Sequence, residues 1–262
     1  MQRFRELAPG VHVATEQELT TNSTAVAHPG GGSLLIDPAV SAADLAGLAA
    51  DLAGAGLAPR AGFATHPHWD HVLWSRALGD VPRYAAAAAA ALTEAEHDLL
   101  AENLRTRSPG HELDLAGRLT ALPDGTGLIP WDGPEAQLVV HDGHAPGHAA
   151  VFFPHTGVLV AGDMLSDMEI PILATERDDA LTEYRTGLDK LAGVREVRWL
   201  VPGHGQVTDA AGFRARVDAD RRYLDRLEAG QPYDDPRSLD GWLVDVHRQQ
   251  SEYVAARSGR EA

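Results

Sequence analysis

The chain has 262 residues, with 38 acidic and 22 basic side chains, 13 His and no Cys, which gives a formal charge of −16. The missing Cys excludes disulfides, thiolate nucleophiles and Cys-based zinc sites, so imidazole and carboxylate would have to bind any transition metal. The acidic charge argues against nucleic acid and anionic membranes as partners, because both require a basic surface. The sequence starts without an apolar leader and has no run of roughly 20 apolar residues, so we expect a cytoplasmic protein.

The first half of the chain alternates short apolar runs with turn residues. The short runs predict strands, and the amphipathic or alanine-rich segments predict helices. We expect strands at 11–14, 23–27, 33–36 and 61–65, and helices at 41–54 and 84–104. The segment 108–133 is rich in Gly and Pro, and we expect loops around a short helix there.

The second half repeats this order and adds a helical tail. We expect strands at 137–141, 149–153, 158–161 and 197–201, and helices at 179–191 and 210–227. Two β-rich blocks, each followed by helices, predict an α/β fold with two sheets inside and helices outside. Leu243, Val246 and Val254 have helical spacing, so we expect a catalytic domain at 1–230 and a helical extension at 231–262 packed on it. A homodimer contact through the tail helix is the alternative.

The most informative segment is Thr65-His66-Pro67-His68-Trp69-Asp70-His71, directly after a predicted strand. Residues two apart in an extended segment point the same way, so His66 and His68 can reach one metal ion. Asp70 and His71 come where the chain turns, and they can address a second ion beside the first. These donors predict a metal site, with zinc as the first choice and iron or manganese as the alternatives.

This H-x-H-x-D-H segment resembles the signature of the metallo-β-lactamase-fold hydrolase superfamily. Three later segments match the family pattern in order: Pro146-Gly147-His148, Gly162-Asp163 and Pro202-Gly203-His204. The resemblance implies a four-layer αβ/βα sandwich with two mixed β-sheets. It also implies one zinc ion on His66, His68 and His148, a second on Asp70, His71 and His204, and Asp163 bridging both.

The resemblance further implies an activity. A hydroxide held between the two metal ions would attack a carbonyl carbon, with Asp70 binding metal and orienting the hydroxide. The ligand set, with Asp163 and no Cys, is similar to that of glyoxalase II-like thioesterases and related lactonases, so we expect hydrolysis of a small ester, thioester or lactone. Hydrolysis of β-lactams is one alternative, and a catalytically silent binding or regulatory protein is another. The segments 66–84 and 161–173 resemble an actinobacterial branch of the superfamily, a likeness that implies no substrate.

Five further residues are candidates for supporting roles. Asp37 resembles the superfamily's Ile-Asp turn, and we expect it to brace the site without touching metal. Trp74 stands where these branches have small residues, so it is expected to reshape the substrate pocket. His144, four residues before His148, and Tyr184, in a predicted helix, each allow a role at the site or one in packing. His111 follows a third Pro-Gly pair, which is either a loop coincidence or part of a lid.

Overall fold

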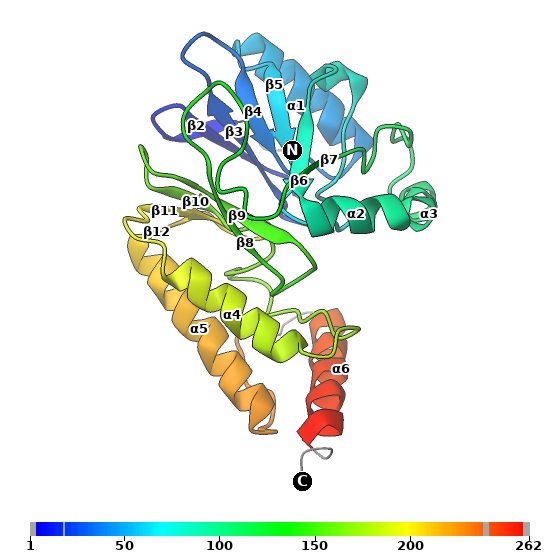
Figure 1. Cartoon of the computed structure of the whole chain (residues 1–262), viewed down its shortest axis with the longest axis vertical. Helices are drawn as coiled ribbons and strands as arrows, with labels where there is room; N and C mark the ends of the chain where they lie inside the picture. The colour runs from blue at the N-terminus through cyan, green and yellow to red at the C-terminus, as the bar shows by residue number, and fades with distance from the viewer. Residues whose placement is uncertain (1–3, 18, 238–240, 259–262) are drawn as a thin grey trace.

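The computed structural model describes residues 4–17, 19–237 and 241–258. Two β-sheets pack face to face, and helices cover both outer faces (Figure 1). This is the predicted four-layer α/β sandwich, and both sheets are mixed, as expected. Within the described ranges, every helix is too short or too polar to cross a membrane.

The first sheet has seven strands in sequence order, from β1 to β7. Pairing is antiparallel as far as β4 and parallel from β4 to β7. The strands are β1 (Arg5–Ala8), β2 (Val11–Thr15), β3 (Asn22–Ala27), β4 (Ser33–Ile36), β5 (Pro59–Phe63), β6 (Arg83–Ala86) and β7 (Thr120–Leu122). The helices associated with this sheet are α1 (Ala42–Gly54), η1 (Arg76–Leu78), α2 (Ala87–Ala95) and α3 (His97–Arg107).

The second sheet has five strands in the order β12-β11-β10-β9-β8. The strands are β8 (Gln137–His141), β9 (His148–Phe153), β10 (Val158–Val160), β11 (Trp199–Val201) and β12 (Thr208–Asp209). The helices α4 (Ala180–Ala192), α5 (Ala210–Glu228) and α6 (Gly241–Ser258) lie on its far side from the first sheet (Figure 1).

Alternating side chains on the strands build three apolar layers. On β3 and β4, Val26 and Leu34 face the second sheet, whereas Leu35 faces α1 and α2. On β9, Phe153 faces the first sheet and Phe152 faces α4 and α5. Because both sheets bury two faces, the polar segments that follow their strands gather at the sheet edges.

Hydrogen bonds join the two sheets at one such edge. The amide of Ala149 at the start of β9 donates to the carbonyl of Thr65 after β5, at 2.8 Å. The amide of Asn22 in β3 donates to the carbonyl of Gly203 after β11, also at 2.8 Å. The segment 65–71, which follows the first sheet, is thereby joined to the second sheet, and the turn 202–205, which follows the second sheet, is joined to the first.

Tertiary pairing overrides local propensity at several places. The predicted helix at 84–104 is wrong at its start, because Arg83–Ala86 forms β6 between β5 and β7. The rest divides into α2 and α3 at Glu96. Within 108–133, all of it described, turns and β7 replace the expected short helix. Strands β1 and β12 were not expected from the sequence, and they form by pairing with β2 and β11.

The C-terminal segment contacts the body through α6. Leu243, Tyr253 and Val254 belong to the apolar layer of α4 and α5. The carboxamide of Gln250 accepts the amide of Leu173 at 2.6 Å. The proposed division into 1–230 and 231–262 stays a prediction, and its residues 1–3, 18, 238–240 and 259–262 lie outside the described chain.

Candidate metal centre

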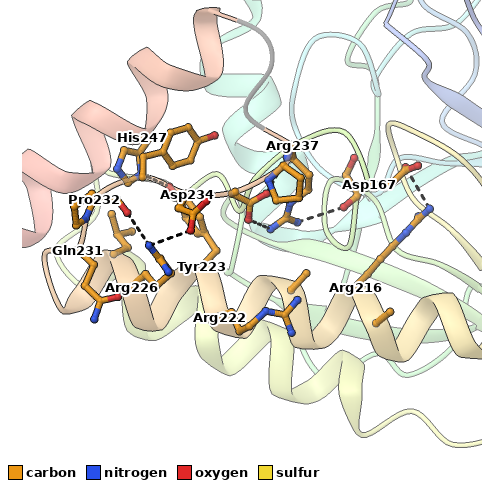
Figure 2. A pocket seen from close by; sticks show the side chains of 17 residues that line it. Asp167, Arg216, Arg222, Tyr223, Arg226, Gln231, Pro232, Asp234, Arg237 and His247 are labelled. Atoms are coloured by element: carbon orange, nitrogen blue, oxygen red, sulfur yellow. Dashed lines mark hydrogen bonds and ion pairs between the residues drawn. The ribbon is translucent and has the colours of Figure 1, made fainter.

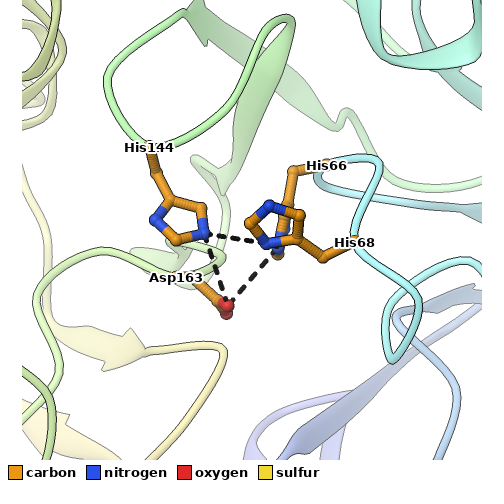
Figure 3. Close-up of side chains that lie close together, drawn as sticks. All are labelled: His66, His68, His144 and Asp163. Atoms are coloured by element: carbon orange, nitrogen blue, oxygen red, sulfur yellow. Dashed lines mark hydrogen bonds and ion pairs between the residues drawn. The ribbon is translucent and has the colours of Figure 1, made fainter. Parts of the chain in front are cut away.

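Three imidazoles and one carboxylate converge at the joined edge of the two sheets (Figure 3). His66 and His68 come from the segment after β5, His144 from the loop before β9, and Asp163 from the segment after β10. Nδ1 of His68 lies 3.1 Å from Nε2 of His66 and 3.0 Å from Nε2 of His144. Oδ2 of Asp163 lies 3.4 Å from Nε2 of His66. His68 is exposed, so the cluster is open to solvent on its side.

A second group of donors lies directly beside the first. Nε2 of His71 lies 3.4 Å from Nε2 of His204, which is 3.2 Å from Oδ2 of Asp70. Asp163 belongs to both groups, because its Oδ2 is also 3.4 Å from Nε2 of His204 and its Oδ1 is 3.1 Å from Nε2 of His71. One carboxylate therefore stands between two sets of imidazoles.

The outer ring nitrogens of four clustered histidines contact protein groups. Nδ1 of His66 lies 3.0 Å from Oγ1 of Thr65, and Nδ1 of His71 lies 3.0 Å from Oδ2 of Asp37. Nδ1 of His144 lies 3.1 Å from the carbonyl oxygen of Ile172, and Nδ1 of His204 lies 2.9 Å from that of Leu19. Such contacts fix the ring orientation and leave Nε2 facing the centre. This pairing of an outer hydrogen bond with an inward nitrogen is typical of metal-binding histidines.

Asp37 ties the segment 65–71 to β4. It accepts the amide of Thr65 at 2.9 Å and the hydroxyl of Thr65 at 2.6 Å, while its Oδ2 contacts His71. Its backbone has φ of +48°, a region that Asp and Asn enter more readily than most residues. Asp37 thus lies behind His71, away from the nitrogens that face the cluster.

Two glycines allow close packing at the cluster, Gly203 against Asp163 and Gly162 against His148. A Cβ at Gly203 would lie 1.9 Å from Oδ1 of Asp163. Gly162 has φ of +57°, and a Cβ there would lie 2.4 Å from Nε2 of His148. The Gly-Asp and Pro-Gly-His motifs therefore reflect close packing around the shared carboxylate.

The charges of the cluster are arranged around its carboxylates. Burial opposes the charged form of Asp163, but its imidazole neighbours, first His71 and then His204, hold its pKa well below the usual range. Burial would lower the pKa of His71, but Asp163 and two further carboxylates raise it well above the usual value. Burial and repulsion from His68 lower the pKa of His144 to about 3. Asp163 is therefore anionic and His144 is neutral at neutral pH, the states that metal binding requires.

The donor set is chemically suited to metal ions. Oδ1 of Asp163 is buried and has no hydrogen-bond partner among the described residues, although Nε2 of His71 is only 3.1 Å away. Buried acceptors without partners are rare, and a bound cation would satisfy this one. Imidazole and carboxylate without thiolate suit zinc, iron and manganese. These residues therefore fit divalent metal ions.

Comparison with known proteins decides the family. The model of the metallo-beta-lactamase superfamily matches residues 17–204, most of the chain and every residue of the two groups. The chain belongs to this superfamily. Membership supports a metal-dependent hydrolase in general and leaves the substrate open.

Individual relatives agree with the superfamily assignment. The probable metallo-hydrolase YflN of Bacillus subtilis is 27% identical over 239 residues, 80% of this chain and 89% of that protein. A beta-lactamase domain protein from Burkholderia ambifaria has the same fold, with a TM-score of 0.68 and 20% identity over 87% of this chain and 78% of that one. The structure of TTHA1623 in a di-iron-bound form gives a TM-score of 0.60 and 27% identity over 78% of this chain and 97% of that chain.

His148, an expected ligand, lies beside the cluster, with its ring centroid 5.2 Å from that of His66 and 5.8 Å from that of His144, but it is not among the grouped donors. It is the first residue of β9, where pairing with His141 of β8 fixes its direction. Its fully buried ring stacks on His141 with centroids 4.6 Å apart, and neither ring nitrogen has a hydrogen-bond partner among the described residues. His144, four residues earlier on the loop, is the residue that joins His66 and His68. The structure thus groups His144 with His66 and His68, and the ligand role of His148 stays a prediction.

Three other candidates lie away from the cluster. Trp74 is buried in the layer between the first sheet and its helices, and its indole donates to the Gly79 carbonyl at 2.9 Å, so it does not shape a pocket above the donors. Tyr184 is fully buried in the layer between α4 and the second sheet. Nε2 of His111 lies 2.9 Å from the carbonyl of Val40, which ties the 108–131 loop to the body.

Glu169 is a residue at the site that sequence reasoning missed. It lies between β10 and α4, and its carboxylate forms a further candidate group with Asp163 and His204. Burial raises the pKa of Glu169 to about 7. The only local signal is its place six residues after Asp163, which has no periodic meaning on a loop.

A cavity of about 410 Å³ lies beside the connection between β10 and α4, at Asp167 (Figure 2). Its walls come from α5, α6 and the connector 231–237, together with Ser166 and Asp167. The buried guanidinium of Arg237 bonds to Asp220 and Asp235 there, and also reaches the carbonyl of Ser166 at 3.4 Å. None of the clustered donors lines this cavity.

Proposed function

We propose that this chain is a dinuclear metal-dependent hydrolase of a small ester, thioester or lactone. The observation that carries the proposal is the position of Asp163, whose Oδ2 lies 3.4 Å from Nε2 of both His66 and His204. A shared carboxylate of this kind is what a pair of neighbouring metal ions requires. TTHA1623, a relative with two iron ions, supports the same number here.

The proposed ligands follow the two groups in the structure. The first metal ion would be held by His66, His68 and His144, the second by Asp70, His71 and His204, and Asp163 would bridge them. We place His144 in the position that the resemblance implies for His148. Zinc is our first choice for both positions, with iron and manganese as alternatives.

Two bound metal ions would supply a hydroxide nucleophile at neutral pH and would polarise the substrate carbonyl. Asp70 is buried, and its imidazole neighbours His71 and His204 keep its pKa below the usual range. It is therefore a carboxylate at neutral pH, available to orient the hydroxide and to help transfer a proton. The exposed side of His68 is the open approach to these groups. No serine or cysteine nucleophile is needed, which agrees with the absence of Cys.

The choice of substrate class rests on the donor set. Seven His and Asp donors without a thiolate, with one Asp shared, are similar to the set of the thioesterase and lactonase branches. Hydrolysis of β-lactams by the same groups is the second candidate. The intact set of donors argues against a catalytically silent protein, since an unused site has no reason to keep them.

A panel of chromogenic esters, thioesters, lactones and a cephalosporin tests this function. The metal-loaded protein should hydrolyse at least one of the first three classes, and Asp163→Asn should lose turnover and one or both metal ions. Asp51→Asn, an exposed change on α1, is the matched control and should leave both unchanged. Turnover of the cephalosporin alone would overturn the proposed substrate class. A fully loaded protein without any turnover would favour the binding role.

A further inference from the structure

A third carboxylate faces the second group of donors. One oxygen of Glu169 lies within 4.8 Å of a donor atom of both Asp163 and His204, and those three atoms form one compact group. The Glu169 side chain is half-buried. A shift of well under a side-chain length would bring all three atoms around one ion, whose oxygen and nitrogen ligands lie about 2.0–2.2 Å away.

The loop holds Glu169 in this position through Ser166. The hydroxyl of Ser166 donates to the carbonyl of His204 at 2.8 Å and accepts the amides of Met168 at 3.0 Å and Glu169 at 3.1 Å. Next to it, Oδ1 of Asp167 accepts the amide of Gln206 at 2.8 Å. The loop is therefore fixed directly to the turn that carries His204, so Glu169 and His204 keep a defined separation.

Glu169 makes the two positions chemically unlike. The first position has three imidazole donors and shares one carboxylate, a nitrogen-rich set that suits zinc. The second has two imidazoles, from His71 and His204, and would have three carboxylates, from Asp70, Asp163 and Glu169. Oxygen-rich sets with more ligands favour harder ions of higher coordination number, such as manganese.

We propose that Glu169 is a further ligand at the His71 and His204 position and that it strengthens the binding of Mn²⁺ or Fe²⁺ there more than the binding of Zn²⁺. The inference rests on the proposed dinuclear site and goes beyond it by giving the two positions different metal preferences. The two positions should therefore differ in affinity for any one ion.

Metal titrations of the Glu169→Gln variant test this inference. Metal-free wild type, Glu169→Gln and Glu169→Asp are titrated with Mn²⁺ and, separately, with Zn²⁺. Bound metal is counted by mass spectrometry after gel filtration, and affinity is measured by competition with a fluorescent chelator. Glu176→Gln is the matched control, because Glu176 is an exposed glutamate of the same connection between β10 and α4.

We expect Glu169→Gln to weaken Mn²⁺ binding at one position by about 10-fold or more, while the tighter Zn²⁺ changes less than about 3-fold. Glu169→Asp keeps a carboxylate on a shorter stem and should fall in between, and Glu176→Gln should match wild type. Equal Mn²⁺ binding by wild type and Glu169→Gln overturns the inference, and so does loss of turnover with both metal ions retained. Failure of the dinuclear proposal itself would appear in the wild type, as one equivalent or less of either metal.

Discussion

Nδ1 of His71 lies 3.0 Å from Oδ2 of Asp37, and both side chains are buried. The contact fixes the imidazole so that Nε2 faces the second group of donors. Asp37→Asn should keep the fold, because Asn also accepts a positive φ. It should weaken metal binding at this position by about 10- to 100-fold, since the contact that orients the ring loses its charge. Chelator competition measures the effect, with Asp51→Asn as the exposed control; equal affinities would contradict the role of Asp37.

The exchange of His148 for His144 leads to a second prediction. The same replacement is made at both positions, His144→Leu and His148→Leu. His144→Leu should lose metal from the first position, because it removes a donor. His148→Leu should keep both metal ions, because His148 is not among the donors whose atoms lie within 4.8 Å of one another. Loss of metal only in His148→Leu would restore the assignment made from the sequence.

The buried ring of His141 should make the protein sensitive to acid. Burial, with repulsion from Lys190, lowers its pKa to about 4 in the folded state, against about 6.5 in an unfolded chain. Between these values the unfolded chain takes up a proton that the folded chain does not, so the free energy of unfolding falls as the pH falls from 6.5 towards 4. At pH 5 this loss is about 2 kcal/mol.

His141→Asn removes this proton uptake and keeps an acceptor for the amide of Gly143, which bonds to Nδ1 of His141 at 3.2 Å. Urea unfolding of the metal-free protein at pH 7.5 and pH 5 should therefore show a smaller loss of stability for the variant. His155→Asn, at an exposed position, should follow wild type. Parallel profiles for wild type and His141→Asn would show that His141 is not the source of the acid loss.

A fourth prediction concerns the buried guanidinium of Arg237, which is labelled in Figure 2, and its ion pair with Asp220. Arg237→Met would leave Asp220, which is 1% exposed, without its partner. Burial already raises the pKa of Asp220 to about 6, and the loss of Arg237 should lower the stability by about 3–5 kcal/mol. Thermal and urea unfolding measure it. Arg185→Met removes exposed ion pairs with Asp225 and Glu228 and should cost below about 1 kcal/mol.

A double variant separates charge burial from simple packing in this region. Arg237→Met combined with Asp220→Leu removes both charges and should recover most of the lost stability, because it leaves no unpaired buried carboxylate. A double variant as unstable as Arg237→Met alone would contradict this explanation.

The segment 66–71 was predictable because its information is local. Alternating histidines after an apolar strand reach the same ion whatever the rest of the fold does. The two sheets were equally predictable, since their strands are short apolar runs separated by turn residues. The residues that support the donors from outside were predictable only in part. Asp37 was expected to support the site, and it contacts His71.

The remaining features depend on tertiary structure. Whether His144 or His148 reaches the cluster depends on the residue at which β9 begins, and both follow small or turn-forming residues in the sequence. The strand at Arg83–Ala86 exists because β5 and β7 are there to pair with it, against the preference of its alanines for helix. Glu169 reaches the site only because Ser166 fixes its loop to His204.

The central claim is that two metal ions share Asp163, and the metal content of the purified chain tests it most directly. The account predicts two transition-metal ions per chain by inductively coupled plasma mass spectrometry after reconstitution and removal of free metal. Asp163→Asn, measured in the same way, should hold at most one. A wild-type chain that retains one equivalent or less would contradict the account.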